Sequence, residues 1–85
     1  MPEITWNPLK NERLKKTRGV SFEEVLQAEL IVFIKHPGIP HQSLMLFWHN
    51  HYVWAVPYVE TENGMFLKTV YRSRKFTKMH KRGEL

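Results

Sequence analysis

The sequence predicts an α+β fold in which two N-terminal helices pack on an antiparallel sheet of three or four strands. Helix-capping patterns lie in the first third of the chain, at Asn7-Pro8 and at Ser21 with Glu24. Three strand-like runs follow, and the pair Asn63-Gly64, a strong hairpin signal, separates the last two. A chain of 85 residues has room for a single domain, 1–85.

The first helix is predicted over residues 8–17. Asn7 is suited to the N-cap, and Pro8 to the first helical position, where its missing N–H has no intrahelical partner to lose. Leu9 and Leu14 are the only apolar residues of this segment. We therefore expect a mostly polar helix that covers a sheet.

A second helix is predicted to begin after Ser21. Gly19 suits the left-handed position that ends the first helix. The Ser21 hydroxyl should cap the second helix, and Glu24, three residues later, completes the pattern of a capping box. This helix should end near Glu29. The apolar run 30–34 fits either a strand or a continued buried helix, because periodicity alone does not separate them.

The rest of the chain predicts an antiparallel meander with short connections. Its strands are expected at residues 42–48, 52–60 and 65–71. Pro57 conflicts with a central strand because it has no N–H to donate, so we expect a β-bulge there. Tyr52 and Trp54 lie on one face of the second strand, which we interpret as a core face. Residues 74–82 predict a short basic helix or tail, and residues 83–85 should fray.

Positive charge is concentrated at two places in the chain. Thirteen Lys and Arg against eight acidic residues give a net charge of +5. One cluster holds Lys10, Arg13, Lys15, Lys16 and Arg18, and the other holds Lys68, Arg72, Arg74, Lys75, Lys78, Lys81 and Arg82. Two basic clusters around an apolar, aromatic middle favour a polyanionic partner, which could be RNA, DNA or an acidic protein segment. A solvated basic surface is the alternative.

Several function classes are excluded or disfavoured by composition. The chain has no cysteine, which excludes a disulfide framework, a thiolate nucleophile and cysteine-ligated zinc. His49 and His51 flank Asn50, but one such pair falls short of the three or four ligands of a metal site. We expect no metal and no cofactor. The apolar run 30–34 is too short to span a bilayer, and the first residues lack a signal peptide's apolar stretch. A cytoplasmic protein without a membrane partner is expected.

Two separated segments form recognisable motifs. The first is Trp6-Asn7-Pro8-Leu9-Lys10-Asn11 with Gly19-Val20-Ser21-Phe22-Glu23-Glu24, and the second is Arg74-Lys75-Phe76-Thr77-Lys78. In order and spacing they resemble the W-D-x-x-K-N, G-V-S-F-E-E and R-K-A-T-K segments of BrnT-family toxins, from the RelE/ParE-like superfamily. The chain departs from the family at Asn7, Arg18 and His80, where the family usually has Asp, His and Tyr.

The resemblance implies a RelE-like fold, metal-independent ribonuclease activity and a cognate antitoxin. The partners expected are therefore RNA and an antitoxin protein, with room for a toxin homodimer inside the complex. Acidic residues of the antitoxin should face Arg72, Arg74 or Lys10, because occupying the phosphate site is the simplest way to neutralise such a toxin.

RNA cleavage without a metal needs a base for the 2′-hydroxyl, cations for the phosphate and an acid for the leaving 5′-oxygen. Arg74 is the first candidate for the phosphate, because a guanidinium can bind two oxygens at once. Arg72, two residues earlier, would point the same way from an extended chain. The alternative is that one of these arginines pairs with a glutamate of the first helix.

Further candidates come from the basic clusters. Lys10, within the first motif, is the second catalytic cation, and His80 is the proton carrier suggested by its position near the C-terminus. An exposed histidine in a frayed tail is the alternative for His80. Other RNA-binding candidates are Lys15, Lys16, Lys75 and Lys78, with solvated helix faces as the alternative.

Three functions remain open from the sequence. The first is the ribonuclease toxin, the second is a non-catalytic nucleic-acid-binding domain, and the third is an interaction module for an acidic protein. Metal-free RNA cleavage separates the first from the others. Salt-dependent nucleic-acid binding separates the second from the third.

Overall fold

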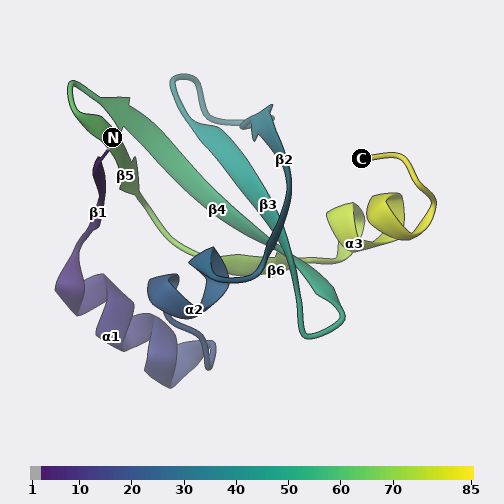
Figure 1. Ribbon diagram of the computed structural model, residues 1–85, viewed down its shortest axis with the longest axis horizontal. Helices are drawn as coiled ribbons and strands as arrows, with labels where there is room; N and C mark the ends of the chain where they lie inside the picture. The colour runs from purple at the N-terminus through teal and green to yellow at the C-terminus, as the bar shows by residue number, and fades with distance from the viewer. Residues whose placement is uncertain (1–2) are drawn as a thin grey trace.

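The computed structural model describes residues 3–85 and has an α+β fold: N-terminal helices, a mixed six-strand sheet and a short C-terminal helix (Figure 1). The elements in chain order are β1 (Glu3–Trp6), α1 (Pro8–Thr17), α2 (Phe22–Leu26), β2 (Glu29–Lys35), β3 (Ser43–His49), β4 (Tyr52–Thr61), β5 (Gly64–Leu67), β6 (Tyr71–Ser73) and α3 (Arg74–Lys81). Within residues 3–85, no helix is long and apolar enough to cross a membrane.

The sheet is larger than predicted and is not purely antiparallel. Its strand order is β1-β5-β4-β3-β2, and β6 also pairs with β4. The neighbours are antiparallel except for β1, which runs parallel to β5. The single strand expected over 65–71 is two strands: β5 pairs with residues 58–61 of β4, and β6 pairs with residues 53–55. The apolar run 30–34 belongs to the edge strand β2.

The β-bulge expected at Pro57 is not in β4 itself: the register shifts by one residue on the partner side, where residues 68–70 face residues 56–57 between the β5 and β6 pairings. The pairing of β3 with β4 runs without a shift from Ser43 opposite Tyr58 to His49 opposite Tyr52. On the other edge of β4, Pro57 lies between the segments that pair with β6 and with β5, and its carbonyl accepts from the Lys68 N–H at 2.8 Å. A residue in an antiparallel strand directs its N–H and C=O to the same neighbour. The missing N–H of Pro57 therefore faces this gap and removes no ladder hydrogen bond.

The two hairpin turns differ from their sequence signals. Asn50 and His51 form a two-residue β3–β4 turn with φ of 50° and 65°, the backbone of a type I′ turn. Gly64, expected in the next turn, is instead the first residue of β5. A Cβ on Gly64 would lie 1.9 Å from the Glu3 carbonyl oxygen. Glycine is required at position 64 because the backbone of β1 approaches it closely.

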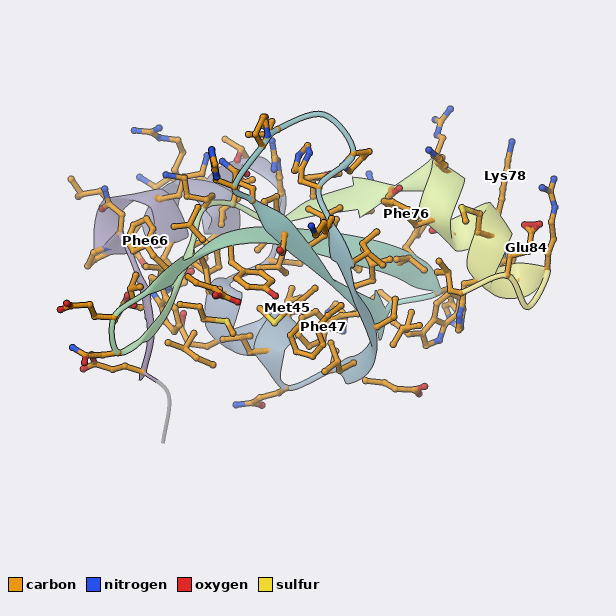
Figure 2. All side chains as sticks on the ribbon, turned by 90° about the horizontal axis from the view of Figure 1, so that it is seen from above. Met45, Phe47, Phe66, Phe76, Lys78 and Glu84 are labelled. Atoms are coloured by element: carbon orange, nitrogen blue, oxygen red, sulfur yellow. The ribbon has the colours of Figure 1, made fainter. Side chains whose placement is uncertain are left out.

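Apolar side chains fill both faces of the sheet. The face under α1 and α2 buries Leu14, Val20, Phe22, Val25, Met45, Phe47, Trp54, Val56, Tyr58, Leu67 and Val70. The opposite face buries Leu44, Leu46, Val53, Ala55 and Phe76, the last from α3. Figure 2 shows Phe76 turned toward the sheet and Lys78 projecting away from the body of the molecule. The helices thus cover different faces, and the alternating residues of β3 and β4 separate the two clusters.

The predicted helix starts are confirmed. The Asn7 side chain accepts from the Leu9 N–H at 2.9 Å, and the Ser21 hydroxyl accepts from the Glu24 N–H at 3.0 Å. The Glu24 carboxylate contacts Nε2 of His49 at 2.6 Å, a partner from β3 that the capping-box pattern did not predict. The second helix ends at Leu26, earlier than the expected Glu29.

The last residues of the chain are held in place, which corrects the expectation that they fray. Gly83 adopts a left-handed backbone with φ of 73°, and the Glu84 N–H donates to the Met79 carbonyl at 2.8 Å. The Gly83 N–H donates to the His80 carbonyl at 3.0 Å, which completes a Schellman motif after α3. Leu85 then packs against the cluster that contains Phe76.

The first motif forms a joint between β1, α1 and α2. Trp6 stacks on Phe22, with ring centres 5.3 Å apart. The buried Asn11 of α1 accepts from the Phe22 N–H at 2.8 Å, and its amide group donates to the Glu23 carboxylate. Because a buried amide costs free energy unless it is bonded, these two contacts fix the start of α2 against α1.

Candidate nucleic-acid interface

The three residues predicted to be catalytic do not come together. Arg74 is the first residue of α3 and is exposed. The His80 ring packs on Trp48 of β3, with ring centres 4.9 Å apart, and is half-buried. Lys10 lies on α1, at the opposite end of the molecule from α3 (Figure 1). No single substrate phosphate can therefore contact all three side chains in this arrangement.

Arg74 instead lies in a cavity with residues from the β3–β4 hairpin. This cavity of about 470 Å³ is lined by His51, Tyr52, Arg74, Thr77, Lys78 and Lys81. The three cations are four and three residues apart on α3, so they share one helix face. His51 belongs to the two-residue turn, and Tyr52 opens β4. The site thus combines three cations, an imidazole and a phenol.

A buried threonine holds the two sides of this cavity together. The Thr77 hydroxyl accepts from the Val53 N–H at 2.8 Å and donates to the Ser73 carbonyl at 2.6 Å. It therefore joins α3 to β4 next to Tyr52. Because both contacts are buried, water competes little for them, and the spacing between helix and hairpin is well defined.

Arg72 lies against the aromatic residues beside this cavity. It stands opposite Trp54 in the pairing of β6 with β4. Its Cζ is 5.1 Å from the centre of the Tyr52 ring and 5.9 Å from that of Trp54. Trp54 is only 5% exposed, which confirms its assignment to the core, but Tyr52 is 37% exposed although it was placed on the same core face. Tyr52 and Arg72 therefore present a stacked, accessible pair.

The sequence predicts that Arg72 and Arg74 point the same way from one extended strand, and this prediction is wrong. Ser73 ends β6, and its hydroxyl caps α3 by accepting from the Phe76 N–H at 3.1 Å. Arg72 thus belongs to the strand and Arg74 to the helix. Within residues 3–85 the ion pairs are Lys15–Glu12, His49–Glu24 and Arg82–Glu84, so neither arginine pairs with a glutamate of α1.

The local field favours anions. No carboxylate lines the Arg74 cavity, and the first turn of α3 holds no acidic residue. The N-terminus of a helix also carries partial positive charge from its aligned peptide dipoles. Arg74 is added to that positive end. An anion bound there would interact with the dipole and with the side-chain cations.

The remaining predicted RNA-binding lysines lie outside the cavity. Lys15 contacts Glu12 at 2.7 Å; this hydrogen bond and the attraction between the charges lower the pKa of Glu12 and raise that of Lys15. Lys16 is exposed on the same helix, and Lys75 lies with its ammonium 5.7 Å from the centre of the Phe76 ring. Of the predicted RNA-binding set, Arg72 and Lys78 are the ones that border the Arg74 site.

The sequence did not indicate His51 or Lys81 as members of this site, and it left Tyr52 open between a core residue and, if exposed, a ring that stacks on bases. His51 was considered only as half of a zinc site; within residues 3–85, no three His or Glu side chains converge on a common point. Its sequence signal is weak, because only the hairpin geometry brings the turn to α3. Left-handed backbone at a residue other than glycine is strained, and such strain is often found at functional sites.

Replacing His51 by glycine should distinguish an effect of this side chain on folding stability from an effect on a reaction at the site. Glycine removes the left-handed strain, about 1–2 kcal/mol, but adds chain entropy of about 0.5–1 kcal/mol to the unfolded state. We expect a melting temperature unchanged or a few degrees higher. If this site cleaves RNA with His51 as the proton carrier, the cleavage rate should also fall about a hundredfold or more. Asn50→Gly, in the same turn, is the matched control and should cleave normally. Wild-type cleavage by His51→Gly would remove His51 from the reaction.

Comparisons of this chain with protein-family models, with curated proteins and with solved structures find no match.

Proposed function

We propose that this protein is a metal-independent endoribonuclease toxin of the BrnT type, with a RelE-like fold, that acts in the cytoplasm and is neutralised by a cognate antitoxin. The observation that carries the proposal is the cavity where Arg74, Lys78 and Lys81 meet His51 and Tyr52. The motif resemblance adds to it, because the R-K-F-T-K segment supplies both Arg74 and the Thr77 that positions α3.

Each side chain has a role that the chemistry requires. The His51 imidazole accepts the proton of the 2′-hydroxyl, whose oxygen then attacks the adjacent phosphorus. Arg74 binds the phosphate oxygens and stabilises the charge that grows in the transition state. The ammonium groups of Lys78 and Lys81 are the donors available to the leaving 5′-oxygen. The products are a 2′,3′-cyclic phosphate and a 5′-hydroxyl, and Tyr52 stacks on a neighbouring base.

The test is cleavage of a single-stranded RNA by the purified protein in EDTA, with and without ribosomes. Products that end in 2′,3′-cyclic phosphate support the proposal, as does growth arrest on expression that the neighbouring gene relieves. Salt-dependent RNA binding without any cleavage would establish the second candidate, a non-catalytic binding domain. The stacked Tyr52 and Arg72 pair favours that candidate, since it binds bases without moving protons.

The antitoxin should cover the same cavity with acidic side chains. Reversing charge in the double variant Arg72→Glu, Arg74→Glu is expected to weaken the complex at least a hundredfold, because like charges then face each other. Lys16→Glu, outside the cavity, is the control and should bind normally. Affinity measured by calorimetry decides the matter. A double variant that binds as tightly as the wild type would show that the antitoxin acts elsewhere.

A further inference from the structure

A second pocket shares no lining residue with the Arg74 cavity, but a contact connects the two: Arg72 lines the second pocket, and its Cζ is 5.1 Å from the ring of Tyr52, which lines the Arg74 cavity. It has a volume of about 330 Å³ and is lined by Thr17, Arg18, Trp54, Tyr71 and Arg72. Two arginines, the C-cap residue of α1 and a residue of β6, thus line one pocket together with the buried Trp54, and the Cζ of Arg72 lies 5.9 Å from the Trp54 ring. No acidic side chain lines this pocket either.

Arg18 is held in position by the strand connection that it contacts. One terminal nitrogen, Nη1, donates to the Thr69 hydroxyl at 3.3 Å and also to the Val70 carbonyl. A guanidinium has five N–H donors, so these contacts leave Nε and Nη2 for a ligand. Arg18 also takes part in none of the ion pairs within residues 3–85. A preorganised arginine loses less entropy when it binds an anion.

We infer that this pocket binds a second phosphate of the RNA strand, one that neighbours the phosphate at Arg74. The inference rests on the proposed function and extends it: the RNA strand would contact a second phosphate site in addition to the cleavage site. A base stacked on Tyr52 would lie between the two pockets, and the phosphates on either side of it would reach Arg18 with Arg72 and Arg74 with Lys78. An exposed ring between two cationic pockets suits a nucleic acid better than an acidic peptide, which has no bases to stack.

The test is binding of RNA oligonucleotides that are 2′-O-methylated throughout, because blocked 2′-oxygens prevent cleavage. Arg18→Gln should bind a hexanucleotide about tenfold more weakly than the wild type, the loss of one charged hydrogen-bonded contact. The slope of log affinity against log salt should fall by about 0.7, as expected for one phosphate on a single strand. A dinucleotide with one phosphate, titrated by NMR, should bind Arg18→Gln and wild type alike.

Arg13→Gln is the matched control, since it removes the same charge from an exposed position of α1, the helix whose C-cap is Arg18. It should bind the hexanucleotide at nearly wild-type affinity. Arg18→Lys keeps the charge without the fork and should fall between wild type and Arg18→Gln, which tests the site even if Arg18→Gln unfolds in a melting experiment. Equal affinities for Arg18→Gln and Arg13→Gln would overturn the inference. So would equal losses for both oligonucleotides, or a loss of antitoxin binding alone.

These outcomes are distinct from those of the proposed function. If the wild type cleaves RNA but Arg18→Gln binds the hexanucleotide like Arg13→Gln, the second phosphate site is wrong and the ribonuclease stands. If the wild type binds RNA through Arg18 but cleaves nothing, the second phosphate site is supported and the proposed ribonuclease activity is wrong.

Discussion

Replacing Arg74 by alanine is expected to reduce RNA cleavage about a hundred- to a thousandfold, which corresponds to about 3–4 kcal/mol of lost transition-state stabilisation. Arg74 begins α3, where the helix dipole and two further lysines add to its field. In the proposed reaction the phosphate gains charge as the 2′-oxygen attacks, so its contact with Arg74 would be stronger in the transition state than in the ground state. Single-turnover cleavage by purified variants, in EDTA, measures this loss.

Folding should survive this substitution. A cation in the first turn of a helix opposes the dipole, and its removal is worth about 0.3–1 kcal/mol in favour of the fold. The melting temperature of Arg74→Ala should therefore equal or exceed that of the wild type. Arg74→Lys should restore part of the rate, because an ammonium keeps the charge without the bidentate fork.

His80→Ala provides the internal comparison for Arg74→Ala. The His80 ring packs on Trp48 and lies outside the cavity, so its loss should lower stability and leave cleavage close to the wild-type rate. Wild-type cleavage by folded Arg74→Ala would show that the phosphate binds elsewhere. A severe cleavage defect in folded His80→Ala would restore the sequence-based assignment of the proton carrier.

The parts of the fold that sequence predicted well depend on local chemistry. Asn7 and Ser21 cap their helices because the bonded N–H groups lie two and three residues away, within reach of a short side chain. Gly19, with φ of 71°, follows from the same local requirement at a helix end. These signals depend on contacts within a few residues of the chain, so the local sequence predicts them without knowledge of the tertiary structure.

The parts that failed depend on partners distant in sequence. Glu24 matches a capping box, but His49, twenty-five residues away, contacts its carboxylate. Gly64 matches a hairpin turn, but the backbone of β1 is the reason it must be glycine. In both cases the sequence predicts a local role for the residue, in a capping box or in a turn. The contact that the residue makes in the structure is instead with a segment distant in sequence.

The residues of the candidate site likewise divide into those that the local sequence indicates and those that only tertiary contacts bring to the site. Arg74, Arg72 and Lys78 were chosen from charge and motif, and the structure places them around one aromatic ring or one cavity. His51 and Arg18 gain their positions only through the β3–β4 hairpin and the contact of α1 with the β5–β6 connection. Neither contact leaves a periodic signal in the sequence, so neither residue could be assigned a role from it.

Replacing Phe22 by alanine should cost about 3–5 kcal/mol of folding free energy, the usual loss for a buried phenylalanine. Its side chain is fully buried, stacks on Trp6 and lies in the cluster under α1 and α2. A domain of this size has about 4–13 kcal/mol of stability in all, at about 0.05–0.15 kcal/mol per residue. We therefore expect a large fall in the urea midpoint or an unfolded protein, with Leu9→Ala as the control because Leu9 is 75% exposed.

This result would also show what the first motif does. Trp6, Asn11 and Phe22 contact one another or share bonds, and none of them lines the Arg74 cavity. The W-x-x-x-K-N and G-V-S-F-E-E segments would then join β1, α1 and α2, while the R-K-F-T-K segment would supply the proposed phosphate site. Phe22→Ala should accordingly lower the amount of folded protein without changing the cleavage rate per folded molecule, measured at a temperature where some remains native. A changed rate per folded molecule would place the joint in the reaction itself.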